Sequence, residues 1–422
     1  MVLRHRIEWR SGGPARSVDV REPAQSGERR GWCPYRGRRC AGVAMAEHAS
    51  EPGALPWASG RPFGGASHGI RMDGDCAPGR DRLAGEVPVG APSVRGVQQD
   101  GVSHWQVSAS RDSPLAMSGE TFRQVGHDLV DQIASFLDGI GDQPVTLGES
   151  PSEIRALLQA DRPMPREGRD PSGLLSETAS MLFEHSLHNG HPRFSGYITS
   201  SAARIGMLGD LLASSVNPNV GAWILSPLAS EIEAQTVRWV AELIAYPTDC
   251  GGLLVSGGNM CNMVCFWAAR VAAGGAEMRE TGRSGDGRPL VAYASAETHT
   301  WIQKAADLSG LGTDILRWIP TRDDLRMDLE QLCAAMDEDI AAGCRPMMVV
   351  ETGGSVGTGA VDELEKMAAI CAERDSWFHV DGAYGGLAAM LADAPEDLHH
   401  LDLADSVAVD PHKWLYVPME AG

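Results

Sequence analysis

The chain contains very little lysine. Only three of its 422 residues are lysines (Lys304, Lys366 and Lys413), whereas 33 are arginines. An arginine side chain keeps its proton in proteins, whereas a lysine amine can lose its proton and form a Schiff base. Lys413 follows the short apolar run "SVAV" and a Pro–His pair, a position typical of the end of a strand. The other two lysines fall within predicted helices, so Lys413 is the candidate for covalent chemistry.

Long apolar runs are also missing, and the charge is far from balanced. No stretch of about 18 apolar residues occurs, so the sequence predicts neither a transmembrane helix nor a membrane partner. The first residues lack the apolar core of a signal peptide. The formal net charge of −20 argues against a nucleic-acid partner, because domains that bind phosphate backbones are usually basic.

Cysteines in paired short spacings are absent too. The nine cysteines are scattered, and no His or Cys pair near Cys261 and Cys265 completes a zinc site. We therefore expect no metal, and we interpret the cysteines as reduced residues of a cytoplasmic protein. The apolar residues, 43% of the chain, can supply a sizeable core, and the length predicts two or more domains.

The chain changes in composition near residue 116. Residues 1–116 contain 16 Arg, no Lys and 12 acidic residues, a balance of +4, while the remainder balances at −24. This first segment is rich in Gly, Pro, Ser and Arg without a helical or strand period, which predicts disorder. One alternative is upstream sequence translated from a misplaced start, because Met117 opens a convincing helix. A basic functional arm is another.

Regular patterns begin after residue 116. Residues 117–204 contain helical patterns such as "SGETFRQVGHDLVDQIASFLDGI", whose apolar residues fall at helical spacing. From residue 205 to 422, short apolar strands such as "LVAYAS", "PMMVVE" and "WFHVD" alternate with helices. This alternation predicts an α/β domain with a mostly parallel sheet covered on both faces. Ligands of such sheets lie beyond the carboxyl ends of the strands.

Four predicted strand ends carry residues suited to one ligand. "SGGNMCN" places Gly258 and Asn259 at a helix start, where backbone N–H groups can bind phosphate, and His299, Asp381 and Lys413 follow three other strands. Each feature also has an interpretation without a ligand. The "SGGNMCN" segment can be an ordinary strand–turn–helix, His299 a helix cap, Asp381 a turn-forming residue and Lys413 a surface lysine. Together they supply a phosphate site, a stacking partner, an acid for a ring nitrogen and an amine. Pyridoxal 5'-phosphate (PLP) requires this set.

The order of the motifs resembles the group II PLP-dependent decarboxylases, the family of aromatic-L-amino-acid and glutamate decarboxylases. The resemblance covers residues from about 120 to 422 and rests on "HPRFSGY", "MLGDLLASSVN", "SPLASEIE", "SGGNMCN", "SAETHTWIQKAADLSG", "HVDGAYGG" and "DPHKW". It implies a fold-type I, PLP-dependent transferase-like α/β large domain at 205–422, with a mostly parallel, seven-stranded type of sheet that is incomplete here. It also implies a homodimer, with the helical segment 117–204 crossing the partner.

The same resemblance implies roles for individual residues. Lys413 would form the Schiff base with PLP, Asp381 would pair with the pyridine nitrogen, and His299 would stack on the cofactor face. The other cofactor contacts would come from small or polar residues: Gly258, Asn259, Ser355, Ala383 and His412.

The implied reaction is decarboxylation of an L-amino acid to an amine and CO₂. Aromatic-amino-acid decarboxylases commonly carry aromatic side chains at two positions that here resemble Ile198 and Gly221. Tyr197 and Trp223 remain as aromatic neighbours, so Tyr197, Ile198 and Trp223 are the predicted substrate contacts. An aromatic substrate is one expectation, and the sequence leaves other amino acids open.

Family members extend well beyond the lysine. They continue through the rest of the large domain, a mobile catalytic loop with a proton-donating Tyr and a small C-terminal domain, whereas this sequence stops nine residues after Lys413. The resemblance therefore implies a C-terminally truncated chain, and it leaves activity open. The alternatives are another fold-type I enzyme (aldehyde synthase, carbon–carbon lyase or aminotransferase) and an inactive fragment.

Overall fold

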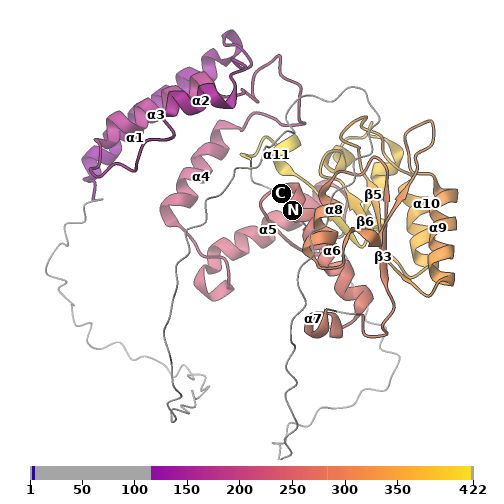
Figure 1. Cartoon of the computed structure of the whole chain (residues 1–422). Helices are drawn as coiled ribbons and strands as arrows, with labels where there is room; N and C mark the ends of the chain where they lie inside the picture. Colours follow the sequence, from indigo (N-terminus) through magenta and orange to yellow (C-terminus); the bar gives the residue numbers. More distant parts are fainter. Residues whose placement is uncertain (1, 5–115, 283, 420–422) are drawn as a thin grey trace, which may run out of the picture. The chain divides into compact units, whose positions relative to one another are not determined.

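The computed structural model describes residues 2–4, 116–282 and 284–419. Most of the segment predicted to be disordered, residues 5–115, lies outside the described residues. The described part begins with helices and continues as an α/β domain (Figure 1). The helices that precede the α/β alternation are α1 (Gly119–Gly139), α2 (Pro151–Leu158), α3 (Pro171–His185), α4 (Arg204–Val216) and α5 (Pro227–Leu243), with the short 3-10 helices η1 (Ile140–Asp142) and η2 (Trp223–Leu225).

The first helices form where the sequence patterns predict them. Ser118 caps α1, since its hydroxyl accepts a hydrogen bond from the backbone N–H of Thr121 at 3.0 Å. Ser150 and Glu153 form a capping box at the start of α2. Phe136 of α1 stacks on Phe183 of α3, with 4.5 Å between ring centroids. None of the helices in the described ranges is both long and apolar enough to span a membrane.

A sheet of seven strands lies at the centre of the α/β domain, counted over the part of the chain that the structure describes. Its order is β2-β1-β7-β6-β5-β3-β4. Strands β3 to β7 pair in parallel, whereas β1 is antiparallel to both of its neighbours. The strands are β1 (Val2–Arg4), β2 (Gly251–Leu253), β3 (Leu290–Ser295), β4 (Leu316–Ile319), β5 (Arg345–Thr352), β6 (Trp377–Asp381) and β7 (Ser406–Ala408). The mostly parallel sheet predicted from the alternation is confirmed.

Helices cover both faces of this sheet. Successive side chains of a strand point to opposite faces, so Tyr293 of β3 joins one core while Ala292 and Ala294 join the other. Figure 1 shows α9 and α10 on one side of β3, and α6 and α8 on the other. These and the remaining short helices are α6 (Gly257–Gly274), α7 (Glu277–Thr281), α8 (Trp301–Leu308), α9 (Leu329–Ala341), α10 (Leu364–Glu373), α11 (Pro411–Trp414), η3 (Thr313–Ile315), η4 (Gly386–Met390) and η5 (Glu396–Leu403).

Strand β1 differs from the sequence prediction. Val2 pairs with Leu253 of β2 and with Ala408 of β7, so the expectation of no regular structure before residue 117 is wrong for Val2–Arg4. A three-residue segment is too short to display a period. Its conformation follows from the two strands beside it, whose backbone N–H and C=O groups it satisfies.

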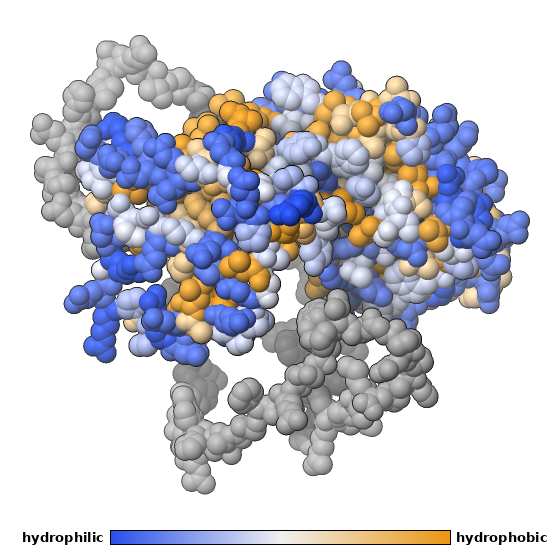
Figure 2. Space-filling view, turned by 90° about the horizontal axis from the view of Figure 1, so that it is seen from above, coloured by the Kyte–Doolittle hydropathy of each residue, from blue (hydrophilic) through white to orange (hydrophobic). Residues whose placement is uncertain are grey.

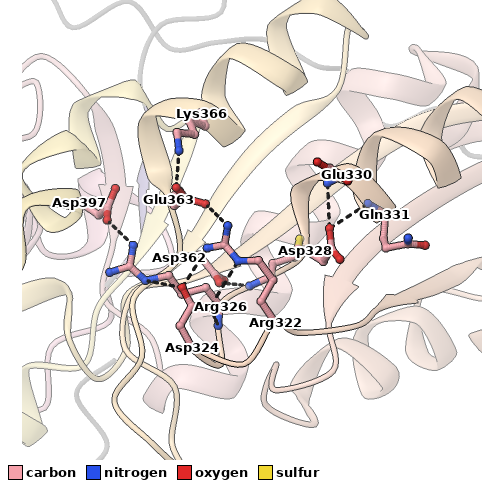
Figure 3. A network of polar contacts seen from close by, with 11 residues as sticks. Arg322, Asp324, Arg326, Asp328, Glu330, Gln331, Asp362, Glu363, Lys366 and Asp397 are labelled. Atoms are coloured by element: carbon pink, nitrogen blue, oxygen red, sulfur yellow. Dashed lines mark hydrogen bonds and ion pairs between the residues drawn. The ribbon is translucent and has the colours of Figure 1, made fainter.

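A polar network ties the connection between β4 and α9 to the elements beside it. Arg322 Nη1 lies 2.9 Å from Glu363 Oε2, and Arg326 Nη1 lies 3.1 Å from Asp397 Oδ2 (Figure 3). Lys366 forms a second ion pair with Glu363. These pairs are partly exposed, so each contributes little free energy alone. Together they fix the loop beside the start of α10.

Next to this network, β5 carries a buried acid. Glu351 is 0% exposed, and neither of its carboxyl oxygens has a hydrogen bond of normal geometry within the described residues. Burial raises the pKa of this carboxyl well above its usual range, the nearby charge of Asp362 raises it further, and the adjacent N–H of Asp362 offsets part of the rise. Asp362 itself accepts backbone hydrogen bonds from Met327 at 2.6 Å and Thr352 at 3.2 Å.

Candidate active site

The carboxyl ends of the parallel strands meet at a cavity of about 410 Å³, a volume within the range of small-molecule sites. The loops that follow β2, β5, β6 and β7 contribute to its wall, and so does the loop before α8. Nine of the residues singled out from the sequence line this cavity: Tyr197, Ile198, Gly258, Asn259, His299, Asp381, Ala383, His412 and Lys413. Residues far apart in the chain are therefore brought to one place.

The start of α6 forms one wall. Gly257 has a φ of +78°, which residues with a side chain rarely adopt. A Cβ on Gly258 would lie 2.5 Å from Asp410 Oδ2, so only glycine fits there without a shift. The two glycines bring the backbone close to the cavity at the positive end of an 18-residue helix. Such a helix start suits a phosphate group.

Lys413 also lies on the cavity wall, in α11. Its Nζ is 3.0 Å from Asp410 Oδ2, and its side chain is 16% exposed. Asp410 is 2% exposed, and its other oxygen, Oδ1, has no hydrogen-bond partner within the described ranges. The other two lysines are exposed on α8 and α10. The cavity thus contains a lysine amine held by a buried carboxylate.

Asp381 ends β6 and is 6% exposed. Its Oδ2 accepts a hydrogen bond from Trp301 Nε1 at 2.7 Å, and its Oδ1 accepts bonds from Asn262 Nδ2 and from the Ala383 backbone N–H, both at 3.3 Å. Burial raises the pKa of this carboxyl. The hydrogen bond from Trp301 and the charge of Lys413 are the largest effects that oppose the rise.

His299 lines the cavity from the loop before α8. Partial burial lowers the pKa of its imidazole, and the nearby Asp381 carboxylate opposes that shift. A neutral, flat ring at this position can pack against another flat ring. His412 lines the same cavity, with its Nε2 3.8 Å from Asp410 Oδ2.

Two predicted residues do not line the cavity. Ser355 is buried, with its hydroxyl 2.6 Å from Thr358 Oγ1. Its neighbour Val356 lies on the cavity wall instead. Trp223 is 57% exposed in η2 and donates a hydrogen bond to Glu231 at 2.9 Å. Neither residue lines the cavity in this single chain, and the contacts of Ser355 with the cofactor and of Trp223 with the substrate stay predictions.

Sequence reasoning missed several residues of the wall. Asn262 lies one helical turn after Gly258, so the helical period alone could have placed it beside the cavity. Thr352 ends β5, and Asp410 directly precedes the "PHKW" motif. No pattern points to Met419, because its position depends on the path of the chain after α11.

The residues present fit a bound PLP molecule. The cavity offers an amine, a buried carboxylate, the start of a helix and a histidine ring. Two buried oxygens of cavity residues, Thr352 Oγ1 and Asp410 Oδ1, have no hydrogen-bond partner among the described residues. Such groups are usually satisfied in folded proteins, so they are positioned to meet polar atoms of a ligand.

Residues 151–422 match the pyridoxal-dependent decarboxylase conserved domain. The chain belongs to this family. It is 31% identical over 308 residues to an aromatic-L-amino-acid decarboxylase of Bacillus atrophaeus, a match that covers 73% of this chain and 62% of that protein. It is 33% identical over 318 residues to a tyrosine decarboxylase of Oryza sativa subsp. japonica, covering 73% of this chain and 58% of that protein.

Solved structures agree with this assignment. The crystal structure of Oryza sativa TDC with PLP and tryptamine matches with a TM-score of 0.66 and 29% sequence identity, covering 73% of this chain and 64% of that chain. The structure of mouse CSAD matches with a TM-score of 0.66 and 26% identity, covering 72% and 63%. The predicted fold class, a PLP-dependent fold-type I domain, is confirmed. The chain spans between 58% and 64% of the length of these four relatives.

Proposed function

We propose that the chain binds PLP and belongs to an enzyme that decarboxylates an L-amino acid to the corresponding amine and CO₂. The observation that carries the proposal is the cavity shared by Lys413, Asp381, His299 and the glycine start of α6. When bound, PLP supplies an aldehyde for an amine and a ring that accepts electrons. Membership of the family supports the same reaction.

Each side chain has a defined part in this proposal. The start of α6, at Gly258 and Asn259, would hold the phosphate through backbone N–H groups. Lys413 would hold the aldehyde carbon covalently until a substrate amine replaces it. Asp381 would keep a proton on the ring nitrogen, because a carboxylate within hydrogen-bond reach favours the charged form of its partner. Asp410, 3.0 Å from the Lys413 amine, would position that amine by an ion pair before the cofactor binds.

The substrate class is supported by the apolar part of the wall. Ile198, Val356 and Met419 line the cavity together with Tyr197 and Tyr384. Apolar and aromatic surface of this kind favours an aromatic or large apolar side chain. We therefore propose an aromatic L-amino acid as the substrate, as the names of the Bacillus and Oryza relatives indicate for those proteins.

A homodimer is part of the proposal. Helices α4 and α5 and the segment η2 expose many large apolar side chains, and apolar residues gather in patches on the face seen in Figure 2. Monomeric proteins rarely leave such surface in contact with water. A second copy of this chain would cover it. The most exposed of these residues are Ile205, Leu212, Val216, Ile224 and Leu228.

We also propose that the protein acts in the cytoplasm. The six cysteines in the described ranges carry free thiols, which suits a reducing compartment. Burial raises the pKa of the Cys261 thiol to about 11, so this thiol stays protonated and unreactive at neutral pH.

The covalent part of the proposal has a direct test. The chain is incubated with PLP and reduced with borohydride, and its peptides are mapped by mass spectrometry. We expect the label on Lys413 and not on Lys304 or Lys366. Lys413→Arg is the matched control, since it keeps the charge and cannot be labelled. A label on either exposed lysine, or none at all, would contradict the assignment.

The reaction itself is tested by CO₂ release. Tyr, Trp, Phe, dihydroxyphenylalanine and Glu are compared as substrates, and the other products are analysed for amine and aldehyde. An aldehyde product would favour the activity named for a relative from Petunia hybrida, a phenylacetaldehyde synthase that is 32% identical over 308 residues. Release from Glu alone would overturn the aromatic substrate.

A further inference from the structure

Two side chains from different helices hold the two oxygens of Asp381. Trp301, the first residue of α8, donates its indole N–H to Oδ2 at 2.7 Å and is 0% exposed. Asn262 of α6 donates its amide N–H to Oδ1 at 3.3 Å and is 2% exposed. A buried carboxylate keeps its charge only when donors replace the water it has lost.

The neighbours of Asn262 decide which way its amide points. Nδ2 faces two acceptors, the carbonyl oxygen of Gly258 at 2.9 Å and Oδ1 of Asp381 at 3.3 Å. The reverse orientation would place the amide oxygen against both of them. Oδ1 of Asn262 therefore faces Nε2 of His379, which lies 2.8 Å away. Because this oxygen can only accept, Nε2 of His379 carries the hydrogen.

The hydrogen bonds on the Nδ1 side of His379 also have their donors pointing toward Asp381. Burial lowers the pKa of this imidazole to about 3, so the ring is neutral and its Nδ1 has no hydrogen. Nδ1 lies 2.9 Å from the hydroxyl and 3.2 Å from the carbonyl oxygen of Ser406. With the hydrogen on Nε2, Nδ1 accepts from the hydroxyl and makes no hydrogen bond to the carbonyl. That hydroxyl accepts in turn from Trp377 Nε1 at 2.8 Å. Each donor in the chain Trp377–Ser406–His379–Asn262 points toward Asp381.

The fold explains why these groups meet. Trp377, His379 and Asp381 alternate along β6 and so share one face of the sheet. Helix α6 covers that face and brings Asn262, while α8 brings Trp301, whose ring meets His379 edge-on at 5.8 Å. Hydrogen bonds that point in one direction polarise one another, so the bond from Asn262 is strengthened by those behind it.

We propose that Trp301, Asn262 and His379 are positioning residues that hold the Asp381 carboxylate in the orientation and charge state required to pair with the ring nitrogen of PLP. The inference deepens the proposed function and rests on it. Other ionisable groups act on Asp381 as well: Lys413 favours its charge, while ionisation of the buried Glu351 would oppose it. His299 also faces Asp381 and interacts with its charge.

The first test separates a role through the ring nitrogen from a structural role. Trp301→Phe removes the N–H and keeps an aromatic ring, and Trp318→Phe, at a half-exposed position of β4, is the matched control. Each protein is titrated with PLP and with its deaza analogue, which has a C–H in place of the ring nitrogen. We expect Trp301→Phe to weaken PLP binding about tenfold or more, the scale of a charge-assisted hydrogen bond, and to leave the analogue unaffected.

Equal weakening for both compounds, or none, would overturn the inference.

A second measurement needs no cofactor, and it tests the positioning role even if the chain binds no PLP. Carboxyl ¹³C NMR of aspartate-labelled protein is followed against pH, and the Asp381 signal is identified by its loss in Asp381→Asn. We expect this carboxyl to titrate at a higher pH in Trp301→Phe and His379→Leu, and His379→Gln, which keeps an N–H donor, to restore part of the difference. Identical titration in all proteins would refute the positioning role.

Discussion

Replacing Glu351 by Gln should reduce the loss of unfolding free energy that occurs as the pH rises above 5. Glu351 is fully buried on β5, its carboxyl oxygens lack hydrogen bonds of normal geometry within the described residues, and burial raises its pKa well above the usual range. The folded state therefore keeps the proton after the unfolded chain has released it. A glutamine has no proton to release in either state, so the variant isolates this effect.

The sign and the size follow from proton linkage. Below the unfolded pKa, about 4.3 for Glu, both states are protonated and the group has no effect on the pH dependence. As pH rises above that value, the unfolded state is favoured by about 1.4 kcal/mol per pH unit for as long as the folded carboxyl stays protonated. Over that range the stability of Glu351→Gln relative to the original chain should therefore rise with pH at this rate.

Urea unfolding followed by tryptophan fluorescence at pH 5, 6, 7 and 8 measures this difference. At pH 5 the variant is expected to be equal or weaker, since the buried amide lacks partners as well and costs about 1–3 kcal/mol. Glu365→Gln, on the exposed face of α10, is the matched control and should show no such trend. Parallel stability curves for Glu351→Gln and the original chain would refute the reasoning.

Two further predictions concern the cavity. Asp381→Asn keeps the shape of the side chain and removes its charge, so CO₂ release should fall by about 10²-fold, or about 2.7 kcal/mol of transition-state stabilisation; unchanged turnover would exclude the ring-nitrogen role. Gly258→Ala should weaken PLP binding and destabilise the fold by about 1–3 kcal/mol, because the new Cβ would lie 2.5 Å from Asp410 Oδ2. Thermal melts of the double variant, Gly258→Ala with Asp410→Ala, should show that stability is recovered. If it is not, the contact with Asp410 is not the cause of the destabilisation.

Much of the sheet could be predicted from the sequence. The runs at 290–295 and 377–381 become β3 and β6, because continuous apolar strands between helices stand out in a parallel sheet. Strand β4 does not stand out in the sequence, since "LRWI" is short and carries a charge. The same limit applies to the three residues of β1.

The cavity could be predicted in part for a related reason. Gly258, His299, Asp381 and Lys413 each follow an apolar run, and the rule that ligands lie at carboxyl ends of strands brings them together. Asn262 could not be assigned to Asp381 in that way, because the two residues are 119 positions apart and meet only through helix packing. Trp301 carried no local sign of its hydrogen bond either, since it reads as an apolar helix residue.

The place of β1 has a consequence for how ligand binding and sheet integrity are connected. Among the strands, β2 has β1 as its single described neighbour, and β1 offers three residues that pair with residues more than 400 positions away at β7. Closing so long a loop has an entropy cost that three residue pairs offset weakly. We therefore expect the backbone amides of β2 to exchange with solvent sooner than those of β5 or β6.

Strand β2 leads within a few residues into the turn Ser256–Gly258 and the start of α6. Any anion that immobilises this turn must also restrain β2, so part of its binding free energy would appear as slower opening of the sheet edge. The phosphate of PLP would then stabilise the edge of the sheet that opens most easily. Amide exchange at β2, compared with and without PLP, would report this coupling from outside the cavity.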